Sequence, residues 1–461
     1  MLLPVDKKDM RGRAGTGAVL SLSANGMQDT YLTDDKNKDS FFNYKNVRHS
    51  NFAKFSNFTR VTNPSTSPTW PFNNTVIVTL NPQTMGDLLC NMFLKCTLPQ
   101  LSDRFTRPEQ AKYCDQIGRA LIEKIEFRVD ENVLEVVEND WGIIHDELFF
   151  TSEEQTTNKA LINGGQKKGE LPDSIVASGP IELYIPLKLF FARKHVLSDS
   201  DNALFLDNFY EPYFPVCAIY NQNIQLRITF KKQTFFTGTN DVISLPRFDI
   251  VTEEISVSAN ERVYLQNKKH SMTIETIIQN PTLNVPISSQ EADMSLTAQV
   301  PIKAFFYFFR KEKFEQDGDS SQFLNRYNYS SSDSTNINTQ TGSPVMSDAI
   351  IVLDGVPLLG KMDTAERNNV HTDIFYKTMI PFQSSMTCGL KNIYMYSFSL
   401  KPKDPAPTGS LNFGLMKIGK NRIKPRFISN LNRGTNDDYV MHVYSQGYRN
   451  IEIENGKLRL I

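Results

Sequence analysis

The six histidines are the first candidates for chemistry in this chain, because imidazole is the commonest metal ligand in proteins. A histidine-based metal site needs two of them close together with a carboxylate, and no His-x-His spacing occurs. The only local cluster of histidine and acids is His145-Asp146-Glu147, in a stretch that reads as a short helix. Adjacent helical residues point in different directions and cannot face one ion. A surface helix is therefore expected, and no metal ligand is predicted.

Nucleotide binding and nucleophilic catalysis find no better support. Residues 12–19 (GRAGTGAV) have the glycines of a phosphate-binding loop, but no strand precedes them and no Lys-Ser/Thr follows. The chain has no Gly-x-Ser-x-Gly elbow, and no cysteine has a sequence neighbour that would activate it. We predict no catalytic residue, no cofactor and no bound metal, and we expect that the protein is not an enzyme.

Cysteines and glycosylation triplets are the remaining chemical features. The five cysteines are odd in number and form no Cys-x-x-Cys pair, so buried free thiols are expected. Three Asn-x-Ser/Thr triplets make candidate glycosylation acceptors of Asn57, Asn73 and Asn328. The N-terminal residues lack the apolar segment of a secretory signal, so we interpret these triplets as chance occurrences.

Composition favours an all-β protein with balanced charge. The 50 basic and 51 acidic residues leave a formal charge of −1, which argues against broad electrostatic binding to nucleic acid. Phe and Tyr supply 31 and 17 residues, and Pro and Gly 23 each, as is typical of short strands separated by turns. No apolar run approaches the roughly 20 residues that a membrane-spanning helix needs.

Period-two patterns predict the strands of the first half. Alternating apolar residues predict strands over 75–80, 181–191 and 224–230, and a hairpin over 125–137 that turns at 130–132. Such strands bury one face against a second sheet, as in a β-sandwich. Helical spacing of apolar residues predicts a short helix over 140–148.

A second series of elements follows mid-chain. We predict strands over 247–257, 271–279, 300–309 and 349–353 and a helix over 259–267; the 300–309 strand is apolar on both faces. The chain ends in a hairpin with Asn455-Gly456, a strong type I′ turn signal. Residues 311–346 are too polar for a core and too long for an ordinary connection. We expect a projecting loop there that folding does not require.

These patterns divide the chain into two similar halves. Residues 1–24 are rich in glycine and basic residues and are predicted to form an N-terminal arm. The first sandwich is assigned to 25–232, a linker to 233–246, and the second sandwich to 247–461, with 311–346 as its long loop. No residue-level repeat relates the halves, so the duplication is inferred from layout alone.

Several segments carry a family resemblance. Residues 392–422 (NIYMYSFSLKPKDPAPTGSLNFGLMKIGKNR) place two strand-like runs around a proline-rich connector. This segment resembles the C-terminal half of the major capsid proteins of nucleocytoplasmic large double-stranded DNA viruses. Residues 17–33, 41–52, 181–193 and 443–453 are similar to further stretches of that family.

The resemblance implies an all-β double jelly roll: two eight-stranded antiparallel β-sandwiches side by side, with a few short helices. It also implies a homotrimer with a pseudo-hexagonal outline that tiles an icosahedral shell. The implied partners are neighbouring capsomers, minor capsid proteins, penton proteins and, through the N-terminal arm, an inner membrane layer, without specific nucleic acid. The implied location is the virion, after assembly in the host cytoplasm.

Two alternatives stay open. A paralogous double jelly-roll protein could serve as a scaffold or minor shell component. A glycan-binding attachment protein is the other reading, with Phe323, Tyr327 and Tyr329 of the long polar loop as aromatic contacts.

Overall fold

The computed structural model describes most of the chain from residue 51 onwards. The described ranges are 51–64, 67–101, 112–164, 174–176, 180–193, 213–238, 242–333, 344–353, 356–358, 374–387, 391–404, 407–413, 426–431 and 437–461. The predicted N-terminal arm (1–24), the family-like segment 17–33 and nearly all of 41–52 lie outside these residues.

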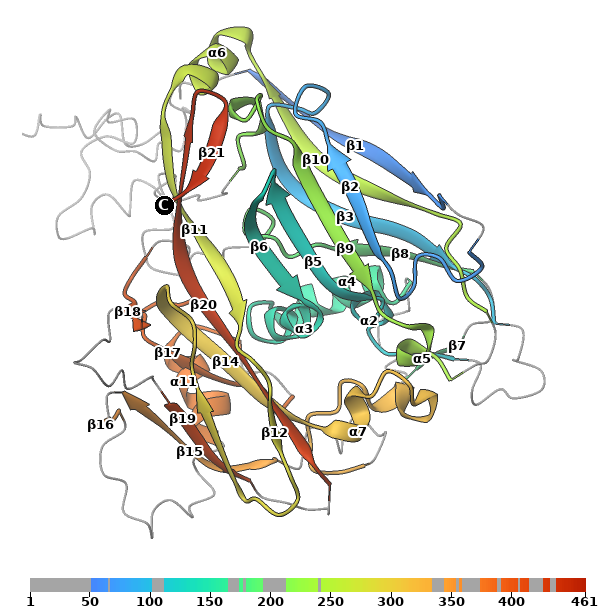
Figure 1. Cartoon of the computed structure of the whole chain (residues 1–461), viewed down its shortest axis with the longest axis vertical. Coiled ribbons are helices and arrows are strands. Elements are labelled where there is room, and N and C mark those ends of the chain that lie inside the picture. Colours follow the sequence, from blue (N-terminus) through green and yellow to red (C-terminus); the bar gives the residue numbers. More distant parts are fainter. Residues whose placement is uncertain are drawn as a thin grey trace, which may run out of the picture. The chain divides into compact units, whose positions relative to one another are not determined.

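The first sandwich consists of two four-stranded antiparallel sheets (Figure 1). One sheet has the order β1 (Phe52–Thr62), β10 (Arg247–Val257), β3 (Leu88–Leu98) and β8 (Ile181–Pro186). The other has the order β2 (Thr75–Leu80), β9 (Ile224–Phe230), β5 (Ile122–Val129) and β6 (Asn132–Glu138). Every second residue of β2 and β9 is buried, as predicted. Phe230 of β9 contacts Phe248 of β10 with ring centroids 5.6 Å apart, so the apolar faces of the two sheets meet in one core.

Strand β10 corrects the predicted boundary at residue 247. The sequence assigned this strand to the second sandwich, but it pairs with β1 over its whole length and with β3 over much of it. The predicted linker is also packed: it contains helix α5 (Gln233–Phe236), and Phe235, Phe236, Ile243 and Leu245 are buried. Sheet membership depends on partners distant in sequence, which period-two patterns do not identify. The other domain limits stay predictions.

The second sandwich repeats this layout. One sheet has the order β11 (His270–Gln279), β20 (Tyr439–Glu454), β14 (Pro301–Lys311) and β17 (Tyr394–Ser397), extended by β12 (Leu283–Val285), β18 (Leu411–Asn412) and β21 (Lys457–Leu460). The facing sheet has the order β13 (Glu291–Ser295), β19 (Arg426–Leu431), β15 (Met346–Leu353) and β16 (Val356–Pro357). Strand β14 is buried on both faces, as predicted for a central strand. The remaining described strands, β4 (Lys112–Cys114) and β7 (Ser174–Val176), form a small separate sheet.

Short helices occupy the connections. Helices α3 (Asn139–Leu148) and α6 (Ala259–Asn267) lie where the sequence predicted them. Helix α4 (Ser152–Ile162) was missed, although Thr151 and Glu154 form the capping box that signals a helix start. The others are α2 (Ile117–Ala120), α7 (Glu312–Glu315), α11 (Ile380–Gln383), 3-10 turns at Val216–Ala218 and Ser320–Asn325, and a π-helix at Phe375–Met379. Among the described helices, none combines the length and hydropathy of a membrane span.

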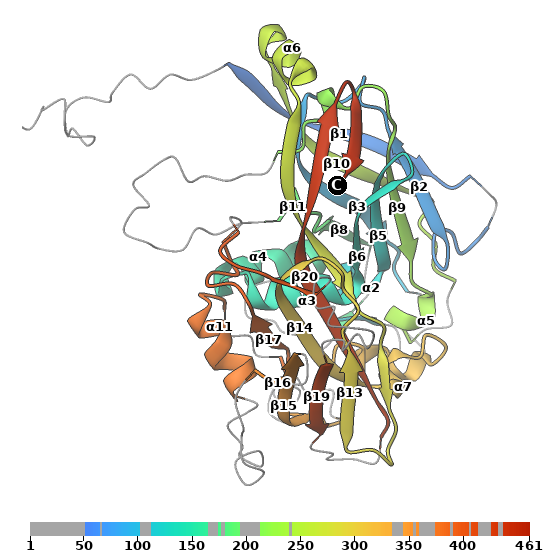
Figure 2. The ribbon, with the colours of Figure 1, turned by 60° about the vertical axis from the view of Figure 1, so that its left-hand side comes forward.

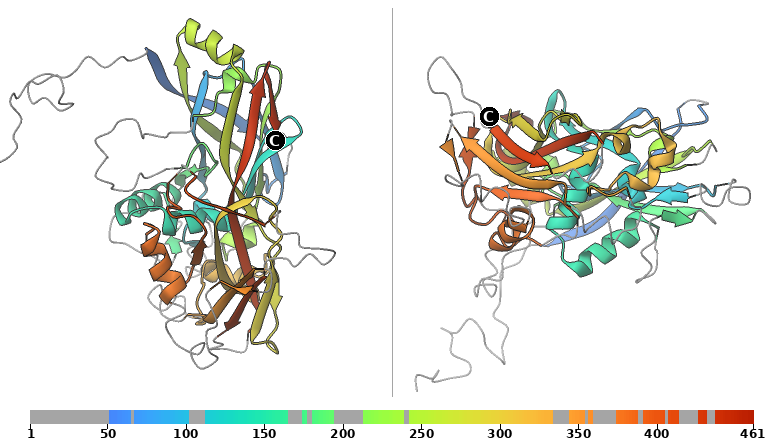
Figure 3. Two further views of the ribbon diagram at one scale, coloured as in Figure 1. Left: turned by 90° about the vertical axis from the view of Figure 1, so that its left-hand side faces the viewer. Right: turned by 90° about the horizontal axis from the view of Figure 1, so that it is seen from below.

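Strand β20 connects the two sandwiches (Figures 2 and 3). Its first half pairs with β14 inside the second sandwich, and its second half continues into the hairpin with β21. The turn of this hairpin contacts the first sandwich, because Asn221 donates its backbone N–H to Gly456 O at 3.1 Å. The predicted turn is confirmed: Asn455 and Gly456 have φ angles of 53° and 77°.

Replacing Gly456 by alanine should lower the free energy of unfolding by about 1–2 kcal/mol. Its φ of 77° is unfavourable for alanine, and the new Cβ would lie 2.7 Å from Asn221 Nδ2 and 2.8 Å from the Tyr220 ring. Gly318→Ala is the matched control, because nothing lies within 4 Å of its Cβ position and its φ is not in the left-handed region. Urea titrations of both variants measure the difference, and equal stabilities would contradict the expectation.

Candidate functional site

Helix α3 lies between the two sandwiches and contacts both of them. It follows directly after β6, and Figures 1 and 2 show it between the ends of β5 and β6 and strand β14. The sequence predicted a surface helix here, but eight of its ten residues are buried, including Asp140, His145 and Asp146. The prediction was wrong because the charged side chains have partners from distant parts of the chain, which the sequence of the helix does not reveal.

Aromatic contacts attach α3 to the second sandwich. The Trp141 ring lies 5.4 Å from Phe306 of β14 and 6.4 Å from Tyr444 of β20, measured between centroids. Phe149, just after the helix, lies 6.1 Å from Phe306. Trp141, Phe306 and Tyr444 are almost completely buried, so these contacts exclude water between the two sandwiches.

A buried ion pair crosses the same junction. Arg310 of β14 donates Nη1 to Asp140 Oδ1 at 2.8 Å and Nη2 to Asp140 Oδ2 at 3.1 Å. Its Nε donates to Glu315 Oε1 at 2.9 Å, and that oxygen also contacts His442 Nε2. Burial opposes the charge of Arg310, but the Asp140 and Glu315 carboxylates outweigh it and hold the pKa of Arg310 well above its usual range. This bidentate geometry favours a defined orientation of helix α3 against β14.

A second charge cluster holds α3 within the first sandwich. The Asp146 carboxylate accepts Arg119 Nε at 3.1 Å and Asn158 Nδ2 at 2.8 Å, and Lys188 Nζ lies 3.7 Å from it. Burial alone would raise the pKa of Asp146, but the Arg119 and Lys188 charges outweigh burial and hold it well below its usual range. The carboxylate is therefore charged and shared by two cations.

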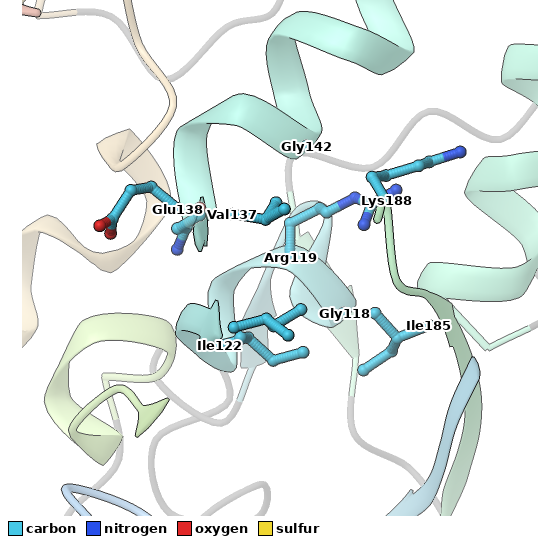
Figure 4. Close-up of a pocket in the computed structure, with 10 residues that line it drawn as sticks. Gly118, Arg119, Ile122, Val137, Glu138, Gly142, Ile185 and Lys188 are labelled. Atoms are coloured by element: carbon cyan, nitrogen blue, oxygen red, sulfur yellow. The ribbon is translucent and has the colours of Figure 1, made fainter. Parts of the chain in front are cut away.

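The cavity beside this cluster is too small for a substrate (Figure 4). Its volume is about 20 Å³, whereas ligand pockets measure roughly 300–1,000 Å³. Arg119 and Lys188 lie on one side of it, and Glu138 lies on the other. Burial raises the pKa of Glu138 to about 7. A second cavity of about 20 Å³, lined by Asp146, Glu147 and Lys159 among others, is equally small. Both cavities fit water-sized occupants.

A third buried cluster connects β6 with the second sandwich. Glu135 of β6 is paired with Arg193, whose Nη1 donates to the backbone oxygen of Glu275 on β11 at 3.3 Å. The Glu275 carboxylate is paired with Lys303 of β14 and accepts Gln446 Nε2 at 2.9 Å. Burial raises the pKa of Glu135 despite the opposing effect of Arg193. This cluster and the Asp140–Arg310 pair therefore add polar contacts between the sandwiches to the aromatic ones.

The loop predicted to project is packed over the longer of its described parts, 311–333. It contains α7 and the 3-10 turn, and its residues Phe323, Arg326, Tyr327 and Tyr329 are buried. Tyr327 Oη donates to Asn139 Oδ1 at 2.8 Å, so this segment lies against the start of α3. Residues 334–343 lie outside the described residues. The expectation of a projecting, dispensable loop is corrected for 311–333, because buried hydrogen bonds compensate for its polar composition.

Arg326 organises this loop. It is fully buried, and its guanidinium donates to five backbone carbonyls. The acceptors and distances are Thr234 (3.2 Å), Phe235 (3.0 Å), Phe314 (2.8 Å), Gln316 (3.0 Å) and Asp319 (2.7 Å). Thr234 and Phe235 belong to α5, so one side chain links the loop to the predicted linker. No sequence motif marks this role, since isolated arginines are usually exposed.

The predicted glycosylation acceptors differ in exposure. Asn73 is exposed and Asn57 is partly exposed, on β1. Asn328 is fully buried, with its Oδ1 accepting the backbone N–H of Ser330 at 3.0 Å. An acceptor must reach solvent to carry a sugar, so Asn328 is unsuitable in the folded chain. The burial of Phe323, Tyr327 and Tyr329 likewise removes the aromatic surface on which the glycan-binding alternative rested.

The other candidates for chemistry are not brought together. Cys90, Cys96, Cys114 and Cys217 are buried, and burial raises the pKa of the Cys96 thiol to about 12. Cys388 lies outside the described residues. Within the described ranges, no group of three or more His, Cys, Asp or Glu residues could hold a metal ion.

Exposed aromatic residues are the most prominent surface feature. On β1, Phe52 and Phe58 are 63% and 58% exposed, and Phe55 on the opposite face is 41% exposed. Phe382 of α11 is 73% exposed, and Met379 and Ile374 of the preceding turns are also exposed. Exposed apolar groups of this size are typical of protein–protein contacts. Sequence reasoning missed them, because alternation cannot tell an exposed face from one covered by another sheet.

Two family models match consecutive parts of the chain. The model described as "Major capsid protein N-terminus" matches residues 40–267, and the model described as "Large eukaryotic DNA virus major capsid protein" matches residues 261–455. Their common border falls in α6, the helix after the last strand of the first sandwich.

Curated relatives are viral capsid proteins of low sequence identity. The major capsid protein of Pyramimonas orientalis virus is 22% identical over 95% of this chain and 98% of its own length. That of Paramecium bursaria Chlorella virus 1 is 20% identical over 86% of this chain and 84% of its own length. Probable capsid protein 4 of Acanthamoeba polyphaga mimivirus is 25% identical over 47% of this chain. The chain spans only 38% of that relative and 48% of capsid protein 1 of the same virus.

Solved structures share the fold. A chain of the PBCV-1 virus capsid matches with a TM-score of 0.66 at 16% identity, covering 91% of this chain and 99% of its own. The Faustovirus major capsid protein matches with a TM-score of 0.61 at 11% identity, covering 97% and 96%. With the two antiparallel β-sandwiches described above, these matches confirm the predicted all-β double jelly roll.

Proposed function

Because the chain belongs to the major capsid protein family of nucleocytoplasmic large DNA viruses, we propose that it trimerises into pseudo-hexagonal capsomers that tile an icosahedral shell. The observation that carries the proposal is the coverage of residues 40–455 by the two family models, together with two complete sandwiches in one chain. Three copies of a two-sandwich chain supply six similar blocks, which suits packing into a hexagonal sheet. The proposed role is structural, without catalysis or a cofactor.

The exposed aromatic residues support an assembling subunit. Phe52, Phe55 and Phe58 on one sandwich and Phe382 on the other are costly to leave in water. A ring of three copies is closed by contacts between different surfaces of neighbouring subunits, so apolar areas on different parts of the surface fit that symmetry. Neighbouring capsomers, minor capsid proteins and penton proteins are the proposed further partners. Contact with an inner membrane layer would involve the N-terminal arm (1–24).

We expect the purified protein to be a compact trimer without a stable folded monomer. Obligate interfaces usually bury more than about 2,000 Å² and couple folding to association. Multi-angle light scattering at micromolar concentration should give three times the chain mass of 52.5 kDa. Phe382→Ser should weaken the trimer, whereas Ser320→Ala, in the 3-10 turn, serves as the control. A folded wild-type monomer would refute the trimer.

The location and abundance of the protein distinguish the major role from a minor one. The virion shell is the location that the family assignment supports, and assembly in the host cytoplasm is part of the proposal. A paralogous scaffold or minor shell protein would share the fold but not the copy number. Quantitative mass spectrometry of purified particles should find this chain as the most abundant component; a sparse or absent chain would favour the paralogous role.

A further inference from the structure

His145 occupies an unusual place in helix α3, at the junction between the sandwiches. Its side chain is 1% exposed, and neither ring nitrogen has a hydrogen-bond partner among the residues that the structure describes. The ring stacks on Phe149 at 4.8 Å with planes 4° apart, and Phe150 lies edge-on at 5.3 Å. A buried imidazole normally has a partner for at least one nitrogen. The stacking therefore fits a neutral ring packed as an aromatic group.

The acid beside the His145 ring, Asp146, is already engaged by other cations. On its own helix, Asp146 Oδ1 lies 3.8 Å from Nδ1, beyond hydrogen-bond distance, and this carboxylate already serves Arg119 of α2. From the segment after β8, Lys188 approaches the same carboxylate, and Arg193 contributes a further positive charge. Helix α4 contributes the neutral Asn158, hydrogen-bonded to Asp146. From the second sandwich, Arg310 of β14 is engaged by Asp140, at the other end of α3. Two cations, Arg119 and Lys188, thus already share the Asp146 carboxylate.

The C-terminal end of α3 is also an attachment point for the second sandwich. Thr387 donates its backbone N–H to Leu148 O at 2.8 Å, and Lys391 donates its backbone N–H to Glu147 Oε1 at 3.0 Å. Phe149, on which His145 stacks, contacts Phe306 of β14. Any movement that brings His145 to water must therefore disturb contacts between the two sandwiches.

We propose that α3 is an acid-sensitive joint, in which protonation of His145 releases the C-terminal end of the helix from the second sandwich. The released helix exposes the imidazolium to water and loosens the relative orientation of the two sandwiches. The proposal goes beyond the shell-building role, because it concerns a response of the folded chain whether or not it is assembled. In a shell, loosening every subunit at this joint would weaken the lattice in acid.

The pH window follows from the two states of the histidine. Burial lowers the pKa of His145 to about 3, with Lys188 acting in the same direction, whereas an exposed imidazole titrates near 6.5. The closed joint therefore keeps its full stability above about pH 6.5 and loses it as the pH falls towards 3. The open population should rise about tenfold per pH unit in this window. Burial raises the pKa of Glu138 to about 7, so this residue makes folding more favourable as the pH falls, which is opposite to the effect of His145. Variants must therefore separate the effects of the two residues.

Native-state hydrogen exchange of the full-length protein tests the joint directly. After correction for the intrinsic exchange rate, protection of the α3 amides should fall about 100-fold between pH 6.5 and 4.5. In His145→Phe, which keeps the aromatic stack without a titrating group, this fall should disappear. His270→Gln is the matched control, because His270 lies at the start of β11 beside α6 and should leave the wild-type profile unchanged.

A fluorescence experiment is a second, independent test of the proposal. The chain has two tryptophans, and Trp70→Phe leaves Trp141 of the joint as the only reporter. Quenching of Trp141 by acrylamide should increase in acid in this background and not in Trp70→Phe/His145→Phe. Lys188→Met, which keeps the histidine and removes a nearby cation, should reduce the response. An unchanged pH response in His145→Phe would overturn the proposal, as would core strands β5 and β14 losing protection by the same factor as α3.

Discussion

Replacing Arg326 by alanine should lower the free energy of unfolding by about 4 kcal/mol or more, or leave the protein insoluble. The guanidinium is fully buried and donates to five backbone carbonyls, three in or next to the α7 and 3-10 segment and two in α5. Alanine would leave those oxygens buried without donors and open a cavity beside Phe235, whose ring lies 4.8 Å from the guanidinium. Thermal and urea unfolding at matched subunit concentration measure the loss.

Two companion variants sharpen this experiment. Arg326→Lys keeps the positive charge but offers three donors without the planar fork, so it should recover only part of the stability. Arg60→Ala removes an exposed arginine paired with Asp249 and should cost less than about 1 kcal/mol. If Arg326→Ala lowers the free energy of unfolding no more than Arg60→Ala does, the loop is loose and dispensable, as the sequence predicted. For the same reason, replacing residues 318–343 by a short linker should now destabilise the fold.

Breaking the ion pair between Asp140 and Arg310 should be nearly as damaging. Arg310→Met leaves the Asp140 carboxylate buried between the sandwiches without its cation, which costs about 3–5 kcal/mol. Asp140→Asn should cost less, because Glu315 continues to pair with Arg310. The double variant Asp140→Asn/Arg310→Met removes both charges, so it should be more stable than Arg310→Met alone.

Urea unfolding of the three variants gives this coupling as a double-mutant cycle. Lys54→Met is the control, since Lys54 pairs with Glu253 at 3.7 Å on the exposed strand β1 and should contribute little. Additive losses from the two single variants would mean that Asp140 and Arg310 do not act together. They would also remove the argument that this pair orients α3 against β14.

Local patterns in the sequence were sufficient to predict several of the strands and the final turn. Alternation over 75–80 and 224–230 identified β2 and β9 together with their buried faces. The wholly apolar run at 300–309 identified β14 as a central strand, and Asn455-Gly456 located the final hairpin. These signals are local, because side chains two residues apart share a face and a type I′ turn requires two particular residues. Family membership was likewise readable from the ordered residue types in 392–422.

Only the tertiary structure showed which residues cover each face of the helices and strands. The helical spacing in 140–148 predicted α3, but its burial depends on Arg119, Lys188 and Arg310, which come from three distant segments. The polar composition of 311–333 suggested solvent exposure, whereas Arg326 satisfies its carbonyls internally. A charged residue is costly to bury only without partners, and a sequence shows the charge but not the partner. For the same reason, strand β10 was recognised as a strand, while its place in the first sandwich required the pairing with β1 and β3.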